Sequence, residues 1–251
     1  MRLVRFRFGD RIATGALDDT EIQVLQGTFF QNPVPSGERV SLDDVRLLSP
    51  VLPSKVVAVG RNYSEHAEEM GQEVPDEPLV FLKPSTAVIG PGDPLVRPPM
   101  SQRMDYEGEL AVVIGRPARA VPLDRAAGVI LGYTCGNDVT LRDLQAKDAQ
   151  WARAKGFDGS CPLGPWIETE LDPTDVALTT RVNGHVRQDA RTSDLVFTPA
   201  GLVAFITSFM TLLPGDVVLT GTPAGIGPLS PGDRVEVEVE GIGTLANPVI
   251  E

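Results

Sequence analysis

Short apolar runs dominate the hydrophobic pattern of the chain, and most have the length and periodicity of β-strands. Residues 3–8, LVRFRF, alternate between apolar and charged positions, as expected for a strand with one buried face. The continuous apolar runs KVVAVG at 55–60 and LAVVIG at 110–115 are typical of strands buried on both faces. Two alternating segments flank Asn183-Gly184, a strong hairpin signal. The pattern therefore predicts a strand-rich chain.

Helical periodicity is limited to a few segments. Residues 140–156 predict an amphipathic helix, with Asp138 or Thr140 as its N-cap. Residues 198–212 predict a second helix, because a proline occupies its first turn and Leu213-Pro214 ends it. Residues 61–71 predict a short helix that begins with a capping box of Asn62 and Glu65 and ends at Gly71.

The chain divides most naturally near residue 52, where Ser49-Pro50-Val51-Leu52-Pro53 interrupts any regular element. Residues 1–52 predict a small β-rich block, and residues 53–251 predict the larger domain. Few strand-helix-strand units are visible, so we expect a mainly β fold with a few helices and an antiparallel or mixed sheet. The 25 glycines and 22 prolines among 251 residues agree with many short strands and turns.

Composition and charge narrow the function classes. The formal net charge of −12, without a run of Lys or Arg, argues against nucleic-acid binding. No apolar stretch is long enough to span a membrane, and the first residues lack the apolar block of a signal peptide. Cys135 and Cys161 have no metal-type spacing and are expected to be buried and unpaired. We therefore expect a cytoplasmic protein with no nucleic-acid or membrane partner.

Glu107 and Glu109 are the first candidates for chemistry. In a strand their side chains would point to one face, and two like charges there need a cation, a proton or solvent. Spacing alone does not distinguish them from Glu236, Glu238 and Glu240, which alternate in the same way and which we interpret as an exposed sheet face.

The position of Asp138 adds evidence for a site that the spacing of Glu107 and Glu109 does not provide. It lies between an apolar strand and the predicted helix at 140–156, a position where folds often present functional groups. Together with Glu107 and Glu109 it would form an all-oxygen ligand set, which suits Mg²⁺ or Mn²⁺ and also permits Ca²⁺.

A resemblance to a known family joins these observations. In chain order, the sequence carries GRNYSEHAEEMG, PLVFLKPSTAVIGPGD, DYEGELAVVIG, GYTCGNDVTLRDLQ, RAKGFDGSCPLGPW, VNGHVRQDARTSDLVF and PGDVVLTGTPAGIGP. These motifs resemble the fumarylacetoacetate hydrolase family from about residue 53 to the C-terminus. The resemblance implies a mixed β-sandwich roll and a divalent metal held by Glu107, Glu109 and Asp138. It also implies that the metal chelates the 2-oxo acid head of a substrate and stabilises an enolate.

Further site residues are implied in the same way. His66 and Glu69 match a His-x-x-Glu helix in which the carboxylate orients the imidazole, and Lys155 matches a catalytic lysine. Substrate contacts are implied for three further positions, Arg61, Gln145 and Thr222. Lys83 and Arg142 are interpreted as contacts or as partners of the carboxylates. The segment 61–76 corresponds to a lid over the substrate.

The leading functional hypothesis is a metal-dependent hydrolase that cleaves a C–C bond of an acylpyruvate such as fumarylpyruvate. The alternatives on the same metal site are an oxaloacetate decarboxylase and a 2-hydroxyhepta-2,4-diene-1,7-dioate isomerase or decarboxylase. A metal-binding module without catalysis is a hypothesis of another class, although no position required for catalysis in the family is visibly substituted. The resemblance also implies a homodimer.

Overall fold

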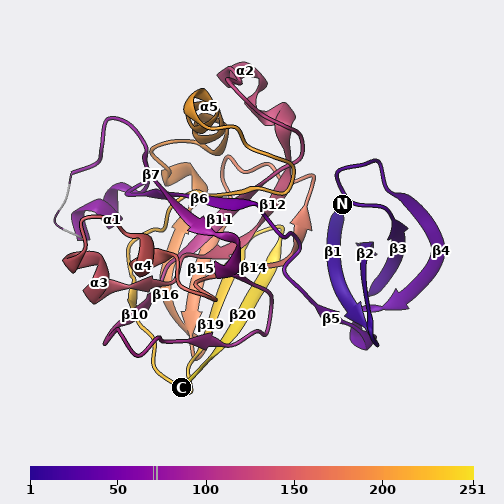
Figure 1. Cartoon of the computed structure of the whole chain (residues 1–251), viewed down its shortest axis with the longest axis horizontal. Helices are drawn as coiled ribbons and strands as arrows, with labels where there is room; N and C mark the ends of the chain where they lie inside the picture. The colour runs from indigo at the N-terminus through magenta and orange to yellow at the C-terminus, as the bar shows by residue number, and fades with distance from the viewer. Residues whose placement is uncertain (70, 72) are drawn as a thin grey trace.

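The computed structural model describes residues 1–251 except 70 and 72 and is built mainly from strands (Figure 1). The helices that it describes are short except for the last: α1 Ser64–Glu69, α2 Leu123–Ala126, α3 Arg142–Lys147, α4 Ala152–Lys155 and α5 Pro199–Phe209. The predicted fold class, mainly β with a few helices, is confirmed. None of the helices among the described residues has both the length and the apolar character needed to span a bilayer.

The largest sheet in the described residues contains 12 strands. They are β1 Arg2–Phe8, β2 Arg11–Asp18, β3 Glu21–Gln26, β4 Val34–Ser41, β5 Arg46–Leu47, β6 Lys55–Gly60, β7 Leu79–Pro84, β8 Val88–Ile89, β11 Gly108–Ile114, β12 Ile130–Asn137, β14 Cys161–Glu168 and β17 Val217–Leu219. The main path runs β4-β3-β2-β1-β14-β12-β11-β17-β6-β7, with β5 paired to β1 and β8 to β14. Most pairs are antiparallel, but β6 pairs with β17 in parallel, so the sheet is mixed as expected.

Two smaller sheets complete the fold. One has the order β16-β15-β19-β20-β9, with β9 Leu95–Val96, β15 Ala177–Val182, β16 His185–Arg191, β19 Arg234–Val239 and β20 Gly243–Ile250. The other has the order β13-β10-β18, with β10 Met104–Tyr106, β13 Thr140–Leu141 and β18 Gly227–Pro228. The predicted hairpin at Asn183-Gly184 joins β15 to β16, and both turn residues have positive φ.

The core lies on both faces of β11, a strand in which every residue is buried. Because side chains alternate along a strand, Leu110 and Val112 pack on one face with β15, β19, β20 and α5. Ala111 and Val113 pack on the other face with residues of β6, β14 and β17. This double burial explains why LAVVIG is continuously apolar, and it places the start of β11 deep inside the molecule.

The N-terminal strands lie to one side of the larger body (Figure 1). They have their own apolar cluster, which includes Phe6 and Ile22, and they join the larger sheet where β1 pairs with β14. The segment between β5 and β6 contains no helix or strand, as its prolines predicted. The division of the chain into domains at residues 52 and 53 stays a prediction.

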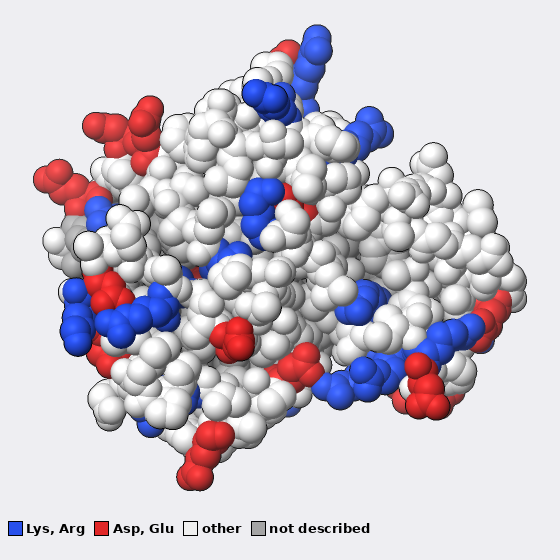
Figure 2. Space-filling view, viewed as in Figure 1, with Lys and Arg blue, Asp and Glu red and all other residues white. Residues whose placement is uncertain are grey.

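Charged side chains of both signs are interspersed on the face shown in Figure 2, and a band of Lys and Arg lies along the lower border of the N-terminal strands. The expected absence of a nucleic-acid partner stays a prediction. Cys135 and Cys161 are buried and unpaired, as expected.

Two helix predictions were wrong in detail. The helix expected at 140–156 is divided into β13, α3 and α4, because Asp148 is extended and ends α3, and its carboxylate instead accepts from Arg153. Residue 141, not 138 or 140, is the N-cap of α3. The capping box at 62 and 65 is also absent from α1, since the Asn62 side chain bonds the backbone of Phe197 and Thr220.

Candidate metal centre and active site

Three acidic side chains meet where β11 begins and β12 ends. Glu107 is the residue between β10 and β11, Glu109 is the second residue of β11, and Asp138 follows β12. The β11–β12 register pairs Gly108 with Asn137, and the Asp138 N–H donates to the Glu107 carbonyl at 2.8 Å. One carboxylate oxygen from each of the three lies within 4.8 Å of the others, and all three residues are buried.

The local structure differs from the single strand that was expected. β10 and β11 belong to different sheets, and Glu107 occupies the junction between them. Gly108 allows this junction because a Cβ there would lie 2.0 Å from the Thr180 Oγ1 of the facing sheet. Gly108 therefore permits close packing against the facing sheet between the two glutamates.

Cations hold two of the three carboxylates. Lys155 Nζ lies 2.7 Å from both Glu107 Oε2 and Asp138 Oδ2. Lys83 Nζ donates to Asp138 Oδ1 at 2.5 Å, and Arg142 donates to Glu107 Oε1 at 2.6 Å. These contacts leave the third carboxylate without an ion pair to any described residue.

Glu109 is that third carboxylate. Its Oε2 accepts a hydrogen bond from the backbone N–H of Gly221 at 2.6 Å. Burial, followed by the charges of Asp138 and Glu107, raises the pKa of Glu109 well above its ordinary value. Burial would also raise the pKa of Glu107, but Lys155, Arg142 and His66 outweigh it and lower that pKa to about 2. The neutral form of Glu109 is therefore favoured, because its negative charge would be the one least compensated in the centre.

A divalent cation fits this arrangement. The donors are all carboxylate oxygens, which suits a hard ion, and a cation beside Glu109 would relieve the repulsion that raises its pKa. The cluster could thus hold a divalent metal ion, while the choice among Mg²⁺, Mn²⁺ and Ca²⁺ stays a prediction.

His66 and Glu69 lie on one face of α1, beside the centre. His66 is buried, and its Nδ1 lies 3.3 Å from Glu69 Oε2. The Gly225 backbone N–H donates to the same carboxylate at 3.2 Å. Gly225 is fixed in turn, since Tyr106 donates to its carbonyl at 2.8 Å. The expected orientation of the imidazole by the carboxylate is thus geometrically available.

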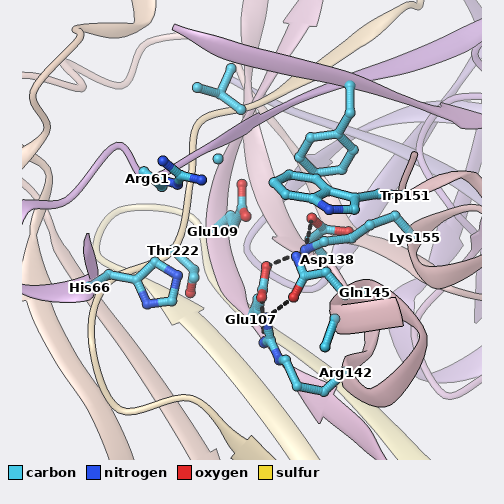
Figure 3. Close-up of a pocket in the computed structure, with 14 residues that line it drawn as sticks. Arg61, His66, Glu107, Glu109, Asp138, Arg142, Gln145, Trp151, Lys155 and Thr222 are labelled. Carbon is cyan, nitrogen blue, oxygen red and sulfur yellow. Dashed lines mark hydrogen bonds and ion pairs between the residues drawn. The ribbon is translucent and has the colours of Figure 1, made fainter. Parts of the chain in front are cut away.

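A cavity of about 380 Å³ opens over the carboxylates, and Figure 3 shows how its labelled side chains converge on them. It brings together nearly all the residues proposed from the sequence: Arg61, His66, Glu107, Glu109, Asp138, Arg142, Gln145, Lys155 and Thr222. Glu69 and Lys83 do not line it. Glu69 lies behind His66, and Lys83 is fully buried behind Asp138.

Two of the proposed substrate contacts already have partners. The Thr222 hydroxyl donates to the Gly108 carbonyl at 2.9 Å and accepts from Gln188 at 2.7 Å. The Gln145 carbonyl oxygen accepts from Arg142 at 2.7 Å. Both residues line the cavity, and their roles as substrate contacts stay predictions.

An aromatic wall was missed by sequence reasoning. Phe81 of β7 and Trp151 line the cavity and pack edge to face, with ring centroids 5.3 Å apart. Lys155 Nζ lies 5.1 Å from the Phe81 centroid. Residue 151 falls within the single helix expected at 140–156, and no local signal marked residue 81 as its neighbour.

Comparison with known proteins identifies related chains. The family profile described as fumarylacetoacetate hydrolase C-terminal matches residues 55–250, and one described as Rv2993c-like, N-terminal, matches residues 1–50. The chain is 54% identical over 260 residues to Protein Rv2993c of Mycobacterium tuberculosis, covering 100% of this chain and 98% of that protein.

Two further relatives carry names that describe an activity. The human mitochondrial oxaloacetate tautomerase FAHD2A is 41% identical over 220 residues, covering 82% of this chain and 70% of that protein. The crystal structure of 5-carboxymethyl-2-hydroxymuconate delta-isomerase from Mycobacterium smegmatis superposes with a TM-score of 0.94. It is 52% identical and covers 100% of this chain and 99% of its own.

Proposed function

The chain belongs to the fumarylacetoacetate hydrolase family, as its motifs predicted, and we propose that it is a divalent-metal-dependent enzyme that moves a proton between the keto and enol forms of a 2-oxo acid. Relatives named as a tautomerase and an isomerase support this class of reaction. Their names favour the isomerase alternative from the sequence over C–C hydrolysis.

The observation that carries the proposal is the carboxylate trio at the base of the cavity. Glu107, Glu109 and Asp138 are buried, are oriented by neighbouring cations and backbone groups, and face a space large enough for a small acid. A divalent cation bound there would polarise the 2-oxo oxygen of a substrate and so favour loss of a proton from the adjacent carbon.

The surrounding residues hold this constellation in place. Lys155 supplies positive charge at the cavity surface between Glu107 and Asp138. Arg142 and Lys83 fix the outer oxygens of the same two carboxylates. Because these residues are locked by ion pairs before the substrate arrives, little reorganisation accompanies the reaction.

His66 is the residue that we assign to proton transfer. Glu69 accepts hydrogen bonds from Gly225 and faces His66 Nδ1, so the favoured tautomer carries its proton on Nδ1. This leaves Nε2 of His66 to take a proton from the substrate carbon and return it.

A tautomerisation assay tests the proposal. The purified protein is treated with EDTA, supplied with Mg²⁺ and given the enol form of oxaloacetate, and the rate of ketonisation above the spontaneous rate is measured. We expect activity only with the metal. Glu109→Gln should abolish it, whereas Glu238→Gln, at a half-exposed position of β19, should not. Full activity in EDTA would exclude the metal-dependent mechanism.

His66→Gln is expected to slow the same reaction by about 10²–10⁴-fold, the usual contribution of a positioned acid or base. Mg²⁺ affinity, measured by calorimetry, should be unchanged, because His66 is outside the carboxylate trio. An unchanged rate would remove His66 from the mechanism.

Hydrolysis of an acylpyruvate such as fumarylpyruvate is the second candidate, and the His66–Glu69 pair favours it, because an oriented imidazole can also activate water. Product analysis on a panel of acylpyruvates and oxaloacetate separates the reactions. Loss of hydrolysis with decarboxylation retained in His66→Ala would assign the imidazole to water activation.

We also propose a homodimer, which a molecular-mass measurement in solution tests, and a cytoplasmic location, which cell fractionation tests.

A further inference from the structure

Gln188 is a buried amide that bonds the backbone around the cavity without lining it. Among the described residues of β16 it is the buried one, with an exposed fraction of 1%. Its Oε1 accepts from the Gly108 N–H at 3.0 Å, and its Nε2 donates to Thr222 Oγ1 at 2.7 Å and to the Pro223 carbonyl at 2.8 Å. These bonds use the acceptor and both donor hydrogens of the amide. Because inward-facing strand positions are usually apolar, a fully bonded amide here points to a specific role.

The loop at residues 220–226 joins β17 to β18 and contains no helix or strand. Near its start the Gly221 N–H donates to Glu109, and near its end the Gly225 N–H donates to Glu69. Both glycines have positive φ, 99° and 97°, a conformation that strains other residues. A single loop therefore contacts a member of the carboxylate trio and the carboxylate assigned to orient the imidazole.

Gln188 fixes the middle of this loop against β16. Thr222 and Pro223, the two loop residues that it bonds, lie between the two glycines. The loop also packs tightly against the same strand at its far end, where a Cβ at Gly225 would lie 2.1 Å from the carbonyl oxygen of Arg187. Because a loop outside any helix or sheet depends on such contacts for its shape, loss of the amide would release both N–H donors together.

We infer, building on the proposed function, that Gln188 is a positioning residue that orients Glu109 and Glu69 together through the 220–226 loop. The metal ligand and the proton-transfer pair are thereby coupled, although the amide itself bonds neither carboxylate. Groups that orient metal ligands typically contribute about 10- to 100-fold to metal affinity or activity. Gln188 contributes to both, because the N–H groups of one loop serve both carboxylates.

Gln188→Met tests this coupling, since methionine is of similar length and uncharged but cannot donate to the loop. Calorimetry measures the dissociation constant of Mg²⁺, and the ketonisation assay measures kcat with Mg²⁺ well above that constant. We expect the dissociation constant to rise by about 10- to 100-fold, and kcat to fall by about 10-fold or more even with the metal site filled. If the methionine variant does not fold, Gln188→Asn, which keeps the amide on a shorter side chain, takes its place in the same measurements.

Asn247→Leu is the matched control. Asn247 is also a strand amide with an exposed fraction of 1%, and its Nδ2 donates to the carbonyl groups of Gly90 and Asp93, none of which lines the cavity. The control should lower the melting temperature, because buried hydrogen bonds are lost, while Mg²⁺ affinity and kcat keep their wild-type values. A purely structural role for Gln188 predicts this same result for Gln188→Met.

A second background distinguishes positioning from a general loosening of the fold. If Gln188 acts on proton transfer through Glu69, Gln188→Met should reduce kcat much less in a Glu69→Ala protein than in the wild type, and should still weaken Mg²⁺ binding by the full factor. With an active wild type, three results for Gln188→Met would overturn the inference alone: equal reductions of kcat in the two backgrounds, a change in only one of the two quantities, or wild-type values for both. A wild type that binds no Mg²⁺ or does not accelerate ketonisation would overturn the proposed function, and the inference with it.

Discussion

Without metal, the Glu109→Gln protein should be more stable than wild type. With metal bound, it should be less stable than wild type. Glutamine keeps the shape of the side chain and an oxygen that can accept from the Gly221 N–H. It removes the negative charge that lies beside Glu107 and Asp138 without an ion pair to any described cation. The sign of the effect should therefore depend on the metal.

The magnitude follows from the geometry of the trio. The carboxylate oxygens lie within 4.8 Å of one another. At that distance, and with an effective dielectric constant of about 20, each pair of like charges costs about 3 kcal/mol. Lys155 and Lys83 screen part of this repulsion, so we expect a net gain of about 1–3 kcal/mol for Glu109→Gln. For a chain of this size each kcal/mol raises the melting temperature by about 2–4 °C.

The pH dependence has a definite sign. Because the pKa of Glu109 is raised in the folded protein, the folded state binds its proton more tightly than the unfolded chain. The stability from that proton is fully present below the ordinary pKa of 4.5 and is lost as the pH rises through the raised folded value. In EDTA, the advantage of Glu109→Gln over wild type should therefore grow as the pH increases.

Differential scanning calorimetry at several pH values, in EDTA and in Mg²⁺, measures these effects. A metal at 100 times its dissociation constant should stabilise the wild type by about 2.7 kcal/mol, and the glutamine variant far less. Glu238→Gln is the matched control, since Glu238 belongs to an alternating Glu series but is half-exposed and paired with Arg181. A Glu109→Gln protein that is less stable than wild type in EDTA at alkaline pH would refute the reasoning.

Two other substitutions probe the packing of the centre. Lys155→Met should destabilise the metal-free protein by about 3 kcal/mol in urea unfolding, because Glu107 and Asp138 lose the cation that they share while staying buried. Gly108→Ala should cost at least about 2 kcal/mol in the same assay and reduce activity, because its methyl group would lie 2.0 Å from Thr180 Oγ1 and would displace the junction that carries Glu107.

Matched controls accompany both. Lys147→Met changes an exposed lysine on α3 and should leave stability nearly unchanged. Gly128→Ala adds a methyl group that meets nothing within 4 Å and should be neutral or stabilising. If the buried and the exposed substitutions lowered the free energy of unfolding equally, the result would contradict the packing that we describe.

Much of the fold could be predicted from local patterns. Continuous apolar runs identified β6 and β11 because strands buried on both faces leave no polar positions. The Asn183-Gly184 turn and the proline-led helix α5 depend on local backbone preferences, and both are present. The helix expected at 140–156 failed because helical periodicity does not report where tertiary contacts end a helix.

Local sequence patterns likewise identified some features of the candidate site and left others to the tertiary structure. Order and spacing of motifs identified Glu107, Glu109 and Asp138 as candidate ligands, but the alternating glutamates of β19 have equivalent spacing and are partly exposed. Burial separates the two sets, and burial depends on which strands pair.

The strand-rich class, the family and the candidate ligands could be inferred from residue type and local order alone. Three relationships became visible in the folded chain: Lys155 joins Glu107 to Asp138, Glu109 has no ion pair with a described cation, and Arg61 lines the cavity without an ion pair to any described residue. These relationships connect residues from separate strands and helices, and their energies depend on distance and on exclusion of water, neither of which is encoded in spacing along the chain.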